Sequence, residues 1–163
     1  MEKLLISACL IGNPVRYNGK ALSITETSLQ QLEHYYELVP LCPEVSAGLA
    51  IPRPPAEIVS KEGDIKVIQN DGLDVSKAFE NGAQIALERC LNQQIKYALL
   101  TDFSPSCGSS KIYDGSFSNT KITGIGITAA KLEQHGIRVF SQFQTDALIN
   151  LAKQRNNKEI KNG

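Results

Sequence analysis

Short apolar runs alternate with amphipathic segments along most of this chain, and the two patterns predict different elements. Compact apolar runs are typical of buried strands, whereas apolar residues spaced three and four apart are typical of helices. Strands that alternate with helices favour an α/β fold of three layers with a mainly parallel sheet in the middle. The predicted strands are 3–8, 38–41, 97–100 and 137–140, and the predicted helices are 25–36, 74–92, 124–135 and 145–153.

The segments between these elements are interpreted from their turn-forming residues. Residues 57–60 and 65–69 are rich in apolar residues on either side of a Glu-Gly-Asp turn, which predicts a hairpin. Prolines make 51–56 an extended, stiff segment. The Ser- and Gly-rich stretch 104–119 is interpreted as a long loop, and a loop of that length inside a compact domain is more often functional than idle.

Length and charge narrow the class of protein further. We expect a single α/β domain over 1–155 and a polar C-terminal tail over 156–163. The 17 basic and 17 acidic residues balance, so no charge excess indicates nucleic acid as a partner. The apolar N-terminal stretch lacks the length of a membrane helix and resembles a first strand more than a secretion signal. We therefore expect a cytoplasmic protein whose cysteines are reduced.

Three of the four cysteines are predicted to meet at one edge of the sheet. Cys9 and Cys42 directly follow predicted strands, and Cys107 follows a third strand after a short loop. Right-handed crossovers place the carboxyl ends of parallel strands at the same edge, where α/β proteins bind ligands. Cys90 differs, because it lies on the apolar face of the predicted helix 74–92, and we interpret it as a core residue.

Converging thiols in a reducing compartment favour a metal centre. A free cysteine is often only a small buried hydrophobe, but Cys42 precedes Pro43 and Cys107 precedes Gly108, as loop residues do. Thiolates suit zinc, Cu(I) and iron–sulfur clusters. A closed zinc site needs four ligands, often in Cys-x-x-Cys pairs, and the chain has no such pair. Three thiolates leave one coordination position open, so we predict a reactive centre, an iron–sulfur cluster above all.

Polar residues near the three cysteines are candidates for the chemistry. Glu44 is a candidate general acid or base, and the alternative is a helix-cap or surface carboxylate. Ser104 and Ser106 flank a proline just before the third cysteine, where they are candidates to position water or substrate, or make only local turn hydrogen bonds. Arg16 and Arg53 lie in loops expected at the same edge, where they are candidates to bind an anion or carboxylate of the substrate, or are solvated surface charges.

These residues stand in segments that resemble the bacterial domain-of-unknown-function 523 family, whose characterised members are thiouracil desulfidases. The resemblance runs in order from about residue 3 to about residue 142. It rests on Ile6-Ser7-Ala8-Cys9-Leu10, Val15-Arg16-Tyr17-Asn18-Gly19, Cys42-Pro43-Glu44-Val45, Pro52-Arg53-Pro54-Pro55-Ala56-Glu57, Asp74-Val75-Ser76, Phe79 to Gly82-Ala83, Ser104-Pro105-Ser106-Cys107-Gly108, Ile112-Tyr113-Asp114-Gly115-Ser116-Phe117 and Gly124-Ile125-Gly126-Ile127-Thr128-Ala129-Ala130.

The resemblance implies a Rossmann-like fold and a [4Fe–4S] cluster held by Cys9, Cys42 and Cys107. It implies that the iron without a protein ligand takes the sulfur of a thiolated pyrimidine base or nucleoside. Water then attacks the thiocarbonyl carbon while Glu44 and Ser104 assist proton transfer. The chain departs from the family just before Ser104, where relatives often carry Lys or Ser and this chain has Thr101-Asp102-Phe103. We expect the bulky side chain of Phe103 to reshape the pocket.

Two other functions are compatible with the same residues. A non-catalytic metal-binding or redox-sensing module would need the three cysteines but not Glu44 or Ser104. A metal-free binder of an anionic ligand would use Arg16, Arg53 and the glycine-rich loops, although no Walker or dinucleotide fingerprint is present. The binder ranks last, because it leaves the convergence of three thiols as coincidence.

Overall fold

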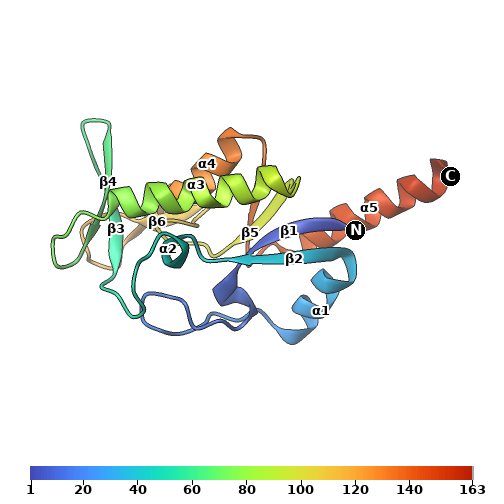
Figure 1. The fold of residues 1–163 in the computed structure, drawn as a ribbon, viewed down its shortest axis with the longest axis horizontal. Helices are drawn as coiled ribbons and strands as arrows, with labels where there is room; N and C mark the ends of the chain where they lie inside the picture. Colours follow the sequence, from blue (N-terminus) through green and yellow to red (C-terminus); the bar gives the residue numbers. More distant parts are fainter. Residues whose placement is uncertain (163) are drawn as a thin grey trace.

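A parallel sheet of four strands forms the centre of the protein (Figure 1). The computed structural model describes residues 1–162. The strand order is β2-β1-β5-β8, so the chain moves outward from β1 on one side and then on the other. This order creates a switch point between β1 and β5, and ligands bind beyond the carboxyl ends of strands at such points. The strands are β1 (Glu2–Ser7), β2 (Tyr36–Leu41), β5 (Tyr97–Leu100) and β8 (Arg138–Ser141).

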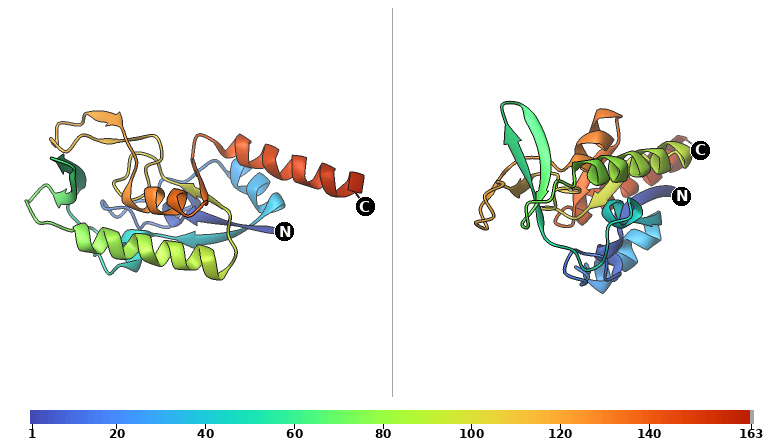
Figure 2. Two further views of the ribbon diagram at one scale, coloured as in Figure 1. Left: turned by 90° about the horizontal axis from the view of Figure 1, so that it is seen from above. Right: turned by 60° about the vertical axis from the view of Figure 1, so that its left-hand side comes forward.

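Helices cover both faces of this sheet, which confirms the predicted α/β architecture (Figure 2). The long helix α3 (Ser76–Asn92) and α4 (Ile127–Gln134) pack on one face. Helices α1 (Glu26–Tyr35) and α5 (Thr145–Asn162) pack on the other. Because alternate residues of a strand point to opposite faces, each central strand contributes to both cores. In β1, Leu5 faces α3 while Leu4 faces α1 and α5.

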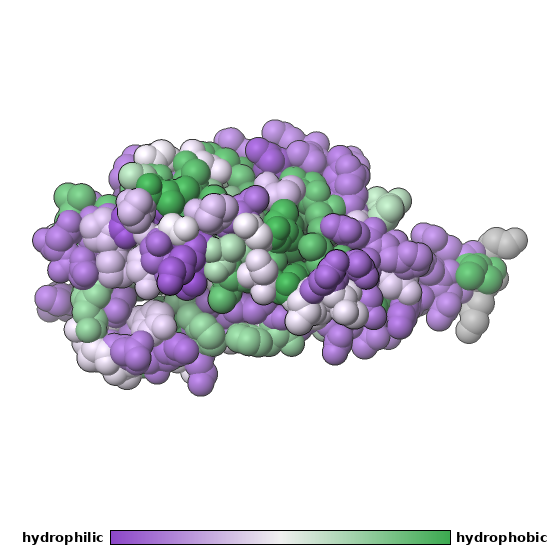
Figure 3. All heavy atoms as spheres, turned by 90° about the horizontal axis from the view of Figure 1, so that it is seen from below, coloured by the Kyte–Doolittle hydropathy of each residue, from purple (hydrophilic) through white to green (hydrophobic). Residues whose placement is uncertain are grey.

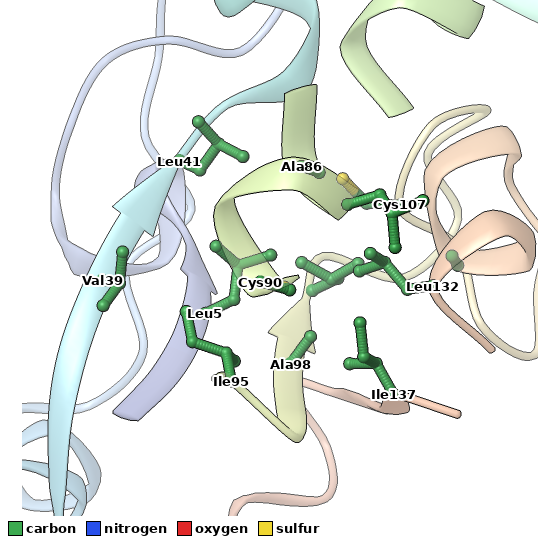
Figure 4. Close-up of a cluster of buried hydrophobic side chains, with 13 residues drawn as sticks. Leu5, Val39, Leu41, Ala86, Cys90, Ile95, Ala98, Cys107, Leu132 and Ile137 are labelled. Carbon is green, nitrogen blue, oxygen red and sulfur yellow. The ribbon is translucent and has the colours of Figure 1, made fainter. Parts of the chain in front are cut away.

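Cys90 lies in the core between α3 and the sheet, as predicted. Its side chain is 1% exposed and packs in the cluster shown in Figure 4. Leu5, Ala98 and Leu132 surround the same space from the sheet and from α4. Full burial of one leucine side chain stabilises a fold by about 1.5–3 kcal/mol. Cys90 is therefore part of the packing of this core.

The start of α1 and the end of α5 show how local sequence sets helix boundaries. The Thr25 hydroxyl accepts a hydrogen bond from the Ser28 N–H at 3.2 Å and caps the start of α1. Helix α5 does not end at Lys153 but continues to Asn162, so the predicted tail is helical up to that residue. Neither glycine nor proline interrupts 154–162. The last residue of the predicted tail lies outside the described residues.

The N-terminus holds the middle of α5 against the sheet. Arg155 forms an ion pair with Glu2 at 2.6 Å, and its guanidinium also lies 5.6 Å from the ring centre of Tyr36. Beyond this contact α5 projects from the body of the molecule (Figure 1), and its surface is mostly hydrophilic (Figure 3). Among residues 1–162, no helix combines the length and apolar character needed to span a bilayer.

Shorter elements gather at the carboxyl edge of the sheet. The predicted hairpin is present as β3 (Ala56–Lys61) and β4 (Asp64–Gln69), paired antiparallel. The prediction of an uninterrupted loop over 104–119 is wrong, because β6 (Lys111–Tyr113) pairs there with β7 (Lys121–Thr123). Strands of three residues are too short to show a hydrophobic period.

Two further corrections concern helix starts at the same edge. Helix α4 begins at Ile127 instead of Gly124, because β7 occupies the chain up to Thr123. The short helix α2 (Pro43–Ser46), which begins at Pro43, is absent from the predicted elements. A proline suits the first helical position, because its missing N–H would have no partner there.

Candidate active site

A cavity of about 450 Å³ lies beyond the carboxyl ends of β1, β2 and β5. A volume of this size is within the range of small-molecule sites, roughly 300–1,000 Å³. Its wall contains all three predicted ligands, Cys9, Cys42 and Cys107, together with Glu44 and Ser104. The sheet topology therefore brings together residues that stand nearly 100 positions apart in the sequence. Arg16 and Arg53 also line the cavity, whereas Ser106 does not.

The first two cysteines are held by short helical turns that follow their strands. After β1 the chain enters a 3-10 turn, η1 (Ala8–Ile11), which carries Cys9. The Cys9 Sγ lies 2.9 Å from the Thr101 hydroxyl oxygen at the end of β5. Cys42 is the residue that caps α2, and its Sγ lies 4.0 Å from the Val15 carbonyl oxygen.

The third cysteine lies in a loop that caps the N-terminus of α4. The first N–H groups of a helix have no partners within the helix, and here carbonyl groups around Cys107 accept from them. Gly126 allows this approach, because a Cβ at that position would lie 2.5 Å from the Ser106 carbonyl oxygen. The N–H groups of Gly126, Ile127 and Thr128 donate to the carbonyls of Gly108, Pro105 and Ser106 at 2.7, 2.8 and 2.8 Å, respectively.

Burial favours the neutral thiol at all three positions. It raises the pKa of Cys9 and Cys42 above the ordinary cysteine value, with partial compensation at Cys9 by the Thr101 hydrogen bond. Burial also raises the pKa of Cys107, and the Glu44 carboxylate and the thiols of Cys42 and Cys9 raise it further. These groups are thus electrostatic neighbours. A bound metal would supply the positive charge that favours thiolates here.

The arrangement of the thiols disfavours a single metal ion. Among residues 1–162, no group of three or more His, Cys, Asp and Glu side chains could hold such an ion. Thiolates on one zinc ion, with bonds of about 2.3 Å, would have to lie about 4 Å apart. The thiolates of a four-iron cluster bind different irons and are spread more widely. Three soft donors around one cavity therefore fit a cluster better than a closed zinc site.

Glu44 and Arg53 form a buried ion pair on the wall of the cavity. Arg53 Nε donates to Glu44 Oε2 at 2.8 Å, and other nitrogens of the guanidinium donate to the carbonyls of Ala50 and Val15. The predicted anion-binding arginine thus directs its donors to the protein itself. Arg16 takes part in no ion pair among the described residues and is the cation that remains for a ligand.

The two serines beside Cys107 have different environments. The Ser104 hydroxyl oxygen accepts from the N–H groups of Ser106 and Cys107 at 3.0 and 3.1 Å, so its own proton remains available for a partner in the cavity. The Ser106 hydroxyl is 2.8 Å from that of Thr128 inside the protein. Ser104 is therefore placed to donate a hydrogen bond, while Ser106 joins the loop to α4.

Sequence reasoning missed residues that hold the walls of the cavity. Asp102 accepts several hydrogen bonds from the loop that carries Cys107, and Glu57 accepts from the N–H groups of Gly115 and Phe117. Both line the cavity. The available signal for Asp102 was its position two residues after a buried strand, because ligand sites of α/β proteins lie beyond the ends of such strands.

The fold and the site define a Rossmann-like α/β protein with a thiol-lined cavity at the switch point of its sheet. The profile of the 2-thiouracil desulfurase family matches residues 4–144, and the chain belongs to this family. The uncharacterized protein YbbK of Bacillus subtilis (strain 168) is 36% identical over 152 residues, which cover 90% of this chain and 99% of that protein.

A solved structure shares the fold over nearly the whole chain. The structure of the [4Fe-4S]-dependent thiouracil desulfidase TudS (DUF523Vcz) superposes with a TM-score of 0.85 at 45% identity, covering 94% of this chain and 99% of that one. The predicted family, fold and class of enzyme are thereby confirmed. The roles of individual site residues and the division into domain and tail stay predictions.

Proposed function

We propose that this chain is a [4Fe–4S]-dependent desulfidase that replaces the sulfur of a thiolated pyrimidine such as thiouracil by oxygen. Cys9, Cys42 and Cys107 hold the cluster, and Glu44 and Ser104 act on the substrate. The observation that carries the proposal is that all five side chains line one cavity at the switch point of the sheet. Membership of the 2-thiouracil desulfurase family supports the choice of reaction.

The donor set agrees with this cofactor, since among residues 1–162 three thiols and no histidine line the cavity. When bound, the cluster supplies a Lewis acid with affinity for the soft thiocarbonyl sulfur. The overall reaction consumes one water: its oxygen becomes the carbonyl oxygen of the pyrimidine, and its two protons leave with the sulfur as hydrogen sulfide.

Glu44 is held in the orientation that a general base requires. Arg53 binds its Oε2 and, through bonds to two backbone carbonyls, cannot move away easily. The other carboxylate oxygen, Oε1, remains to accept a proton from the attacking water. Ser104 donates its hydroxyl proton to the substrate, because its oxygen already accepts two N–H groups.

The rest of the cavity suits a planar, polar ring. Aromatic side chains in its wall offer surfaces on which a pyrimidine stacks, and Arg16 offers a cation to an acceptor of the substrate. The substrate is therefore a small thiolated base or its nucleoside. We place the reaction in the cytoplasm, where reducing conditions keep the thiols available. The aromatic residues are Tyr17, Phe79, Phe103, Tyr113 and Phe117.

The test is anaerobic reconstitution with iron and sulfide, followed by measurement of iron content, the visible spectrum and sulfide release from 2-thiouracil and 4-thiouracil. We expect bound iron with absorbance near 400 nm (roughly, for thiolate-ligated iron) and release of sulfide together with uracil. Serine in place of Cys9, Cys42 or Cys107 should abolish both. Cys90→Ser is the matched control and should retain them, because Cys90 belongs to the core.

A variant of Glu44 separates the enzyme from a sensor built on the same cysteines. Glu44→Gln keeps the size of the side chain and should lower turnover by about 10²–10⁴-fold while iron content is unchanged. Unchanged turnover in this variant would remove Glu44 from the mechanism. Native protein that binds no iron under these conditions would contradict the proposal as a whole.

A further inference from the structure

Asp102 organises the loop that carries Ser104 and Cys107. Its Oδ1 accepts hydrogen bonds from the N–H groups of Phe103, Ser109 and Ser110 at 3.0, 3.1 and 3.2 Å, and from that of Lys111 at 3.4 Å. Its Oδ2 accepts from the Ser110 hydroxyl. The side chain is 4% exposed and stands two residues after the end of β5.

These bonds close the loop at its base. Phe103 is the first residue after Asp102, whereas 109–111 follow the Ser104–Gly108 turn, so one carboxylate joins both ends of the segment. Inside it the Gly108 N–H donates to the Ser104 carbonyl at 2.9 Å. The Asp102 N–H in turn donates to the Gln142 side chain at 2.8 Å, which ties the base of the loop to the end of β8.

The loop is thus held from two sides by different means. On the side of α4, carbonyl groups of the loop cap the helix through backbone bonds that any sequence with Gly126 would permit. On the side of the sheet, the Asp102 carboxylate accepts five hydrogen bonds from the two ends of the loop. We propose that Asp102 is a positioning residue that sets where Ser104 and Cys107 face the cavity. This inference rests on the proposed function for the roles of those two residues.

The negative charge of Asp102 is part of this role. Burial alone would raise the pKa of its carboxyl, but the hydrogen bonds from Ser110 and from backbone N–H groups outweigh burial and hold the pKa below the usual range. A carboxylate accepts at both oxygens, whereas an amide has only one acceptor and places an NH₂ donor at the other position. Asp102→Asn therefore removes the bond with the Ser110 hydroxyl in its present direction and weakens the others.

The direct test measures how often the loop opens in the metal-free full-length protein. Alkylation of each cysteine by iodoacetamide is followed over time by peptide mass spectrometry, because a buried thiol reacts through local opening. Cys107, 6% exposed, reports on the loop, and Cys90, 1% exposed, reports on the core. In Asp102→Asn we expect alkylation of Cys107 to accelerate about tenfold or more, as for loss of a charge-assisted hydrogen bond, with Cys90 unchanged.

Two further variants keep the test decisive. Ser110→Ala removes only the hydroxyl donor and should accelerate the alkylation of Cys107 by a smaller factor. This variant gives a result even if Asp102→Asn folds poorly. Asp74→Asn is the matched control: Asp74 accepts from the Ser76 N–H before α3 and does not line the cavity, so this variant should leave the alkylation of Cys107 unchanged. Equal alkylation of Cys107 in native protein and both loop variants would overturn the proposal.

An equal acceleration of the alkylation of Cys90 and of Cys107 would also overturn the proposal, because Asp102 would then support the whole fold and not the loop. After reconstitution, the kinetics of Asp102→Asn provide a second readout. A displaced Ser104 should lower kcat by about tenfold or more with little change in KM. Because alkylation is measured without metal, its outcome stands apart from the outcome of the desulfidase assay, and failure of either one is recognisable.

Discussion

Arg53 and Glu44 are paired inside the wall of the cavity, with the Arg53 Nε 2.8 Å from the Glu44 Oε2. Only 7% of the arginine side chain and 14% of the glutamate side chain is exposed. Removal of one partner from a buried pair leaves the other charge without compensation. Arg53, predicted from the sequence to bind an anion of the substrate, thus has a carboxylate partner within the protein.

Replacement of this arginine should affect stability as well as catalysis. We expect Arg53→Gln to lower the free energy of unfolding by about 3 kcal/mol, since Glu44 then stays buried without its cation. The measurement is urea unfolding at neutral pH. The double variant Glu44→Gln/Arg53→Gln should recover part of that loss. For comparison, Arg155→Gln breaks a more exposed pair with Glu2 and should change stability by about 1 kcal/mol or less.

Phe103 should influence which substrates fit. Phe103 lines the cavity, and the ammonium of Lys121, on β7, lies 3.9 Å from the centre of its ring. Phe103→Ala should lower kcat/KM for thiouracil by about 10–100-fold through lost packing, and less for a bulkier thiolated base. The assay compares the two substrates in each variant.

The neighbouring Phe143 offers a control for that experiment. Its ring contacts Phe103 at 5.9 Å between centres but is 70% exposed and outside the cavity wall. Phe143→Ala should keep kcat/KM within about twofold, the expectation for an exposed surface substitution. Equal losses in the two variants would mean that the ring of Phe103 has no special role in selecting substrate.

Gly126 should be required for the approach of α4 to the Cys107 loop. The Cβ of an alanine would lie 2.5 Å from the Ser106 carbonyl oxygen, and backbone atoms cannot move aside locally. We expect Gly126→Ala to lower the free energy of unfolding by about 1–3 kcal/mol and to reduce iron content after reconstitution. In Gly124→Ala the new Cβ would lie 2.7 Å from the Cδ1 and Cγ1 of the Ile112 side chain and meet no backbone atom among its nearest neighbours, so this variant should be milder. A thermal unfolding series, with iron analysis of each variant, measures both effects.

The dependence of stability on pH in the acid range should reflect the ionisation of Asp102. Its pKa in the folded protein lies below the ordinary value of 3.8, so the folded state binds fewer protons than the unfolded state in this range. The stabilisation is complete above pH 3.8 and is lost as the pH falls through the folded pKa. The free energy of unfolding of the native protein should therefore exceed that of Asp102→Asn most at neutral pH, and this difference should shrink in acid. Urea midpoints at pH 3 to 7 measure it, and a difference independent of pH would contradict it.

Strong local patterns explain why most elements were predictable. The apolar run Tyr97–Leu100 is β5 itself, and Thr25 caps α1 as its position suggests. Cys90 was assigned to the core from helical spacing alone, which the structure confirms. These features depend on neighbours within a few positions along the chain, and such interactions are visible in a one-dimensional pattern.

The missed elements depend on partners far away in the sequence. Strand β6 exists because it pairs with β7, and α4 starts late because β7 precedes it. Helix α5 continues past Lys153, where the sequence contains a polar segment but no residue that stops a helix. None of these boundaries follows from hydrophobic period.

The convergence of Cys9, Cys42 and Cys107 on one cavity was predictable from the chain, because parallel strands with right-handed crossovers must end at a common edge. The contacts that each neighbouring side chain makes at this cavity were not predictable from the chain. Arg53 faces Glu44, Ser106 faces α4, and Asp102 holds both ends of a loop. Such assignments arise from hydrogen bonds between side chains and backbone that only folding brings within 3 Å or so of each other, so the tertiary structure alone decided them.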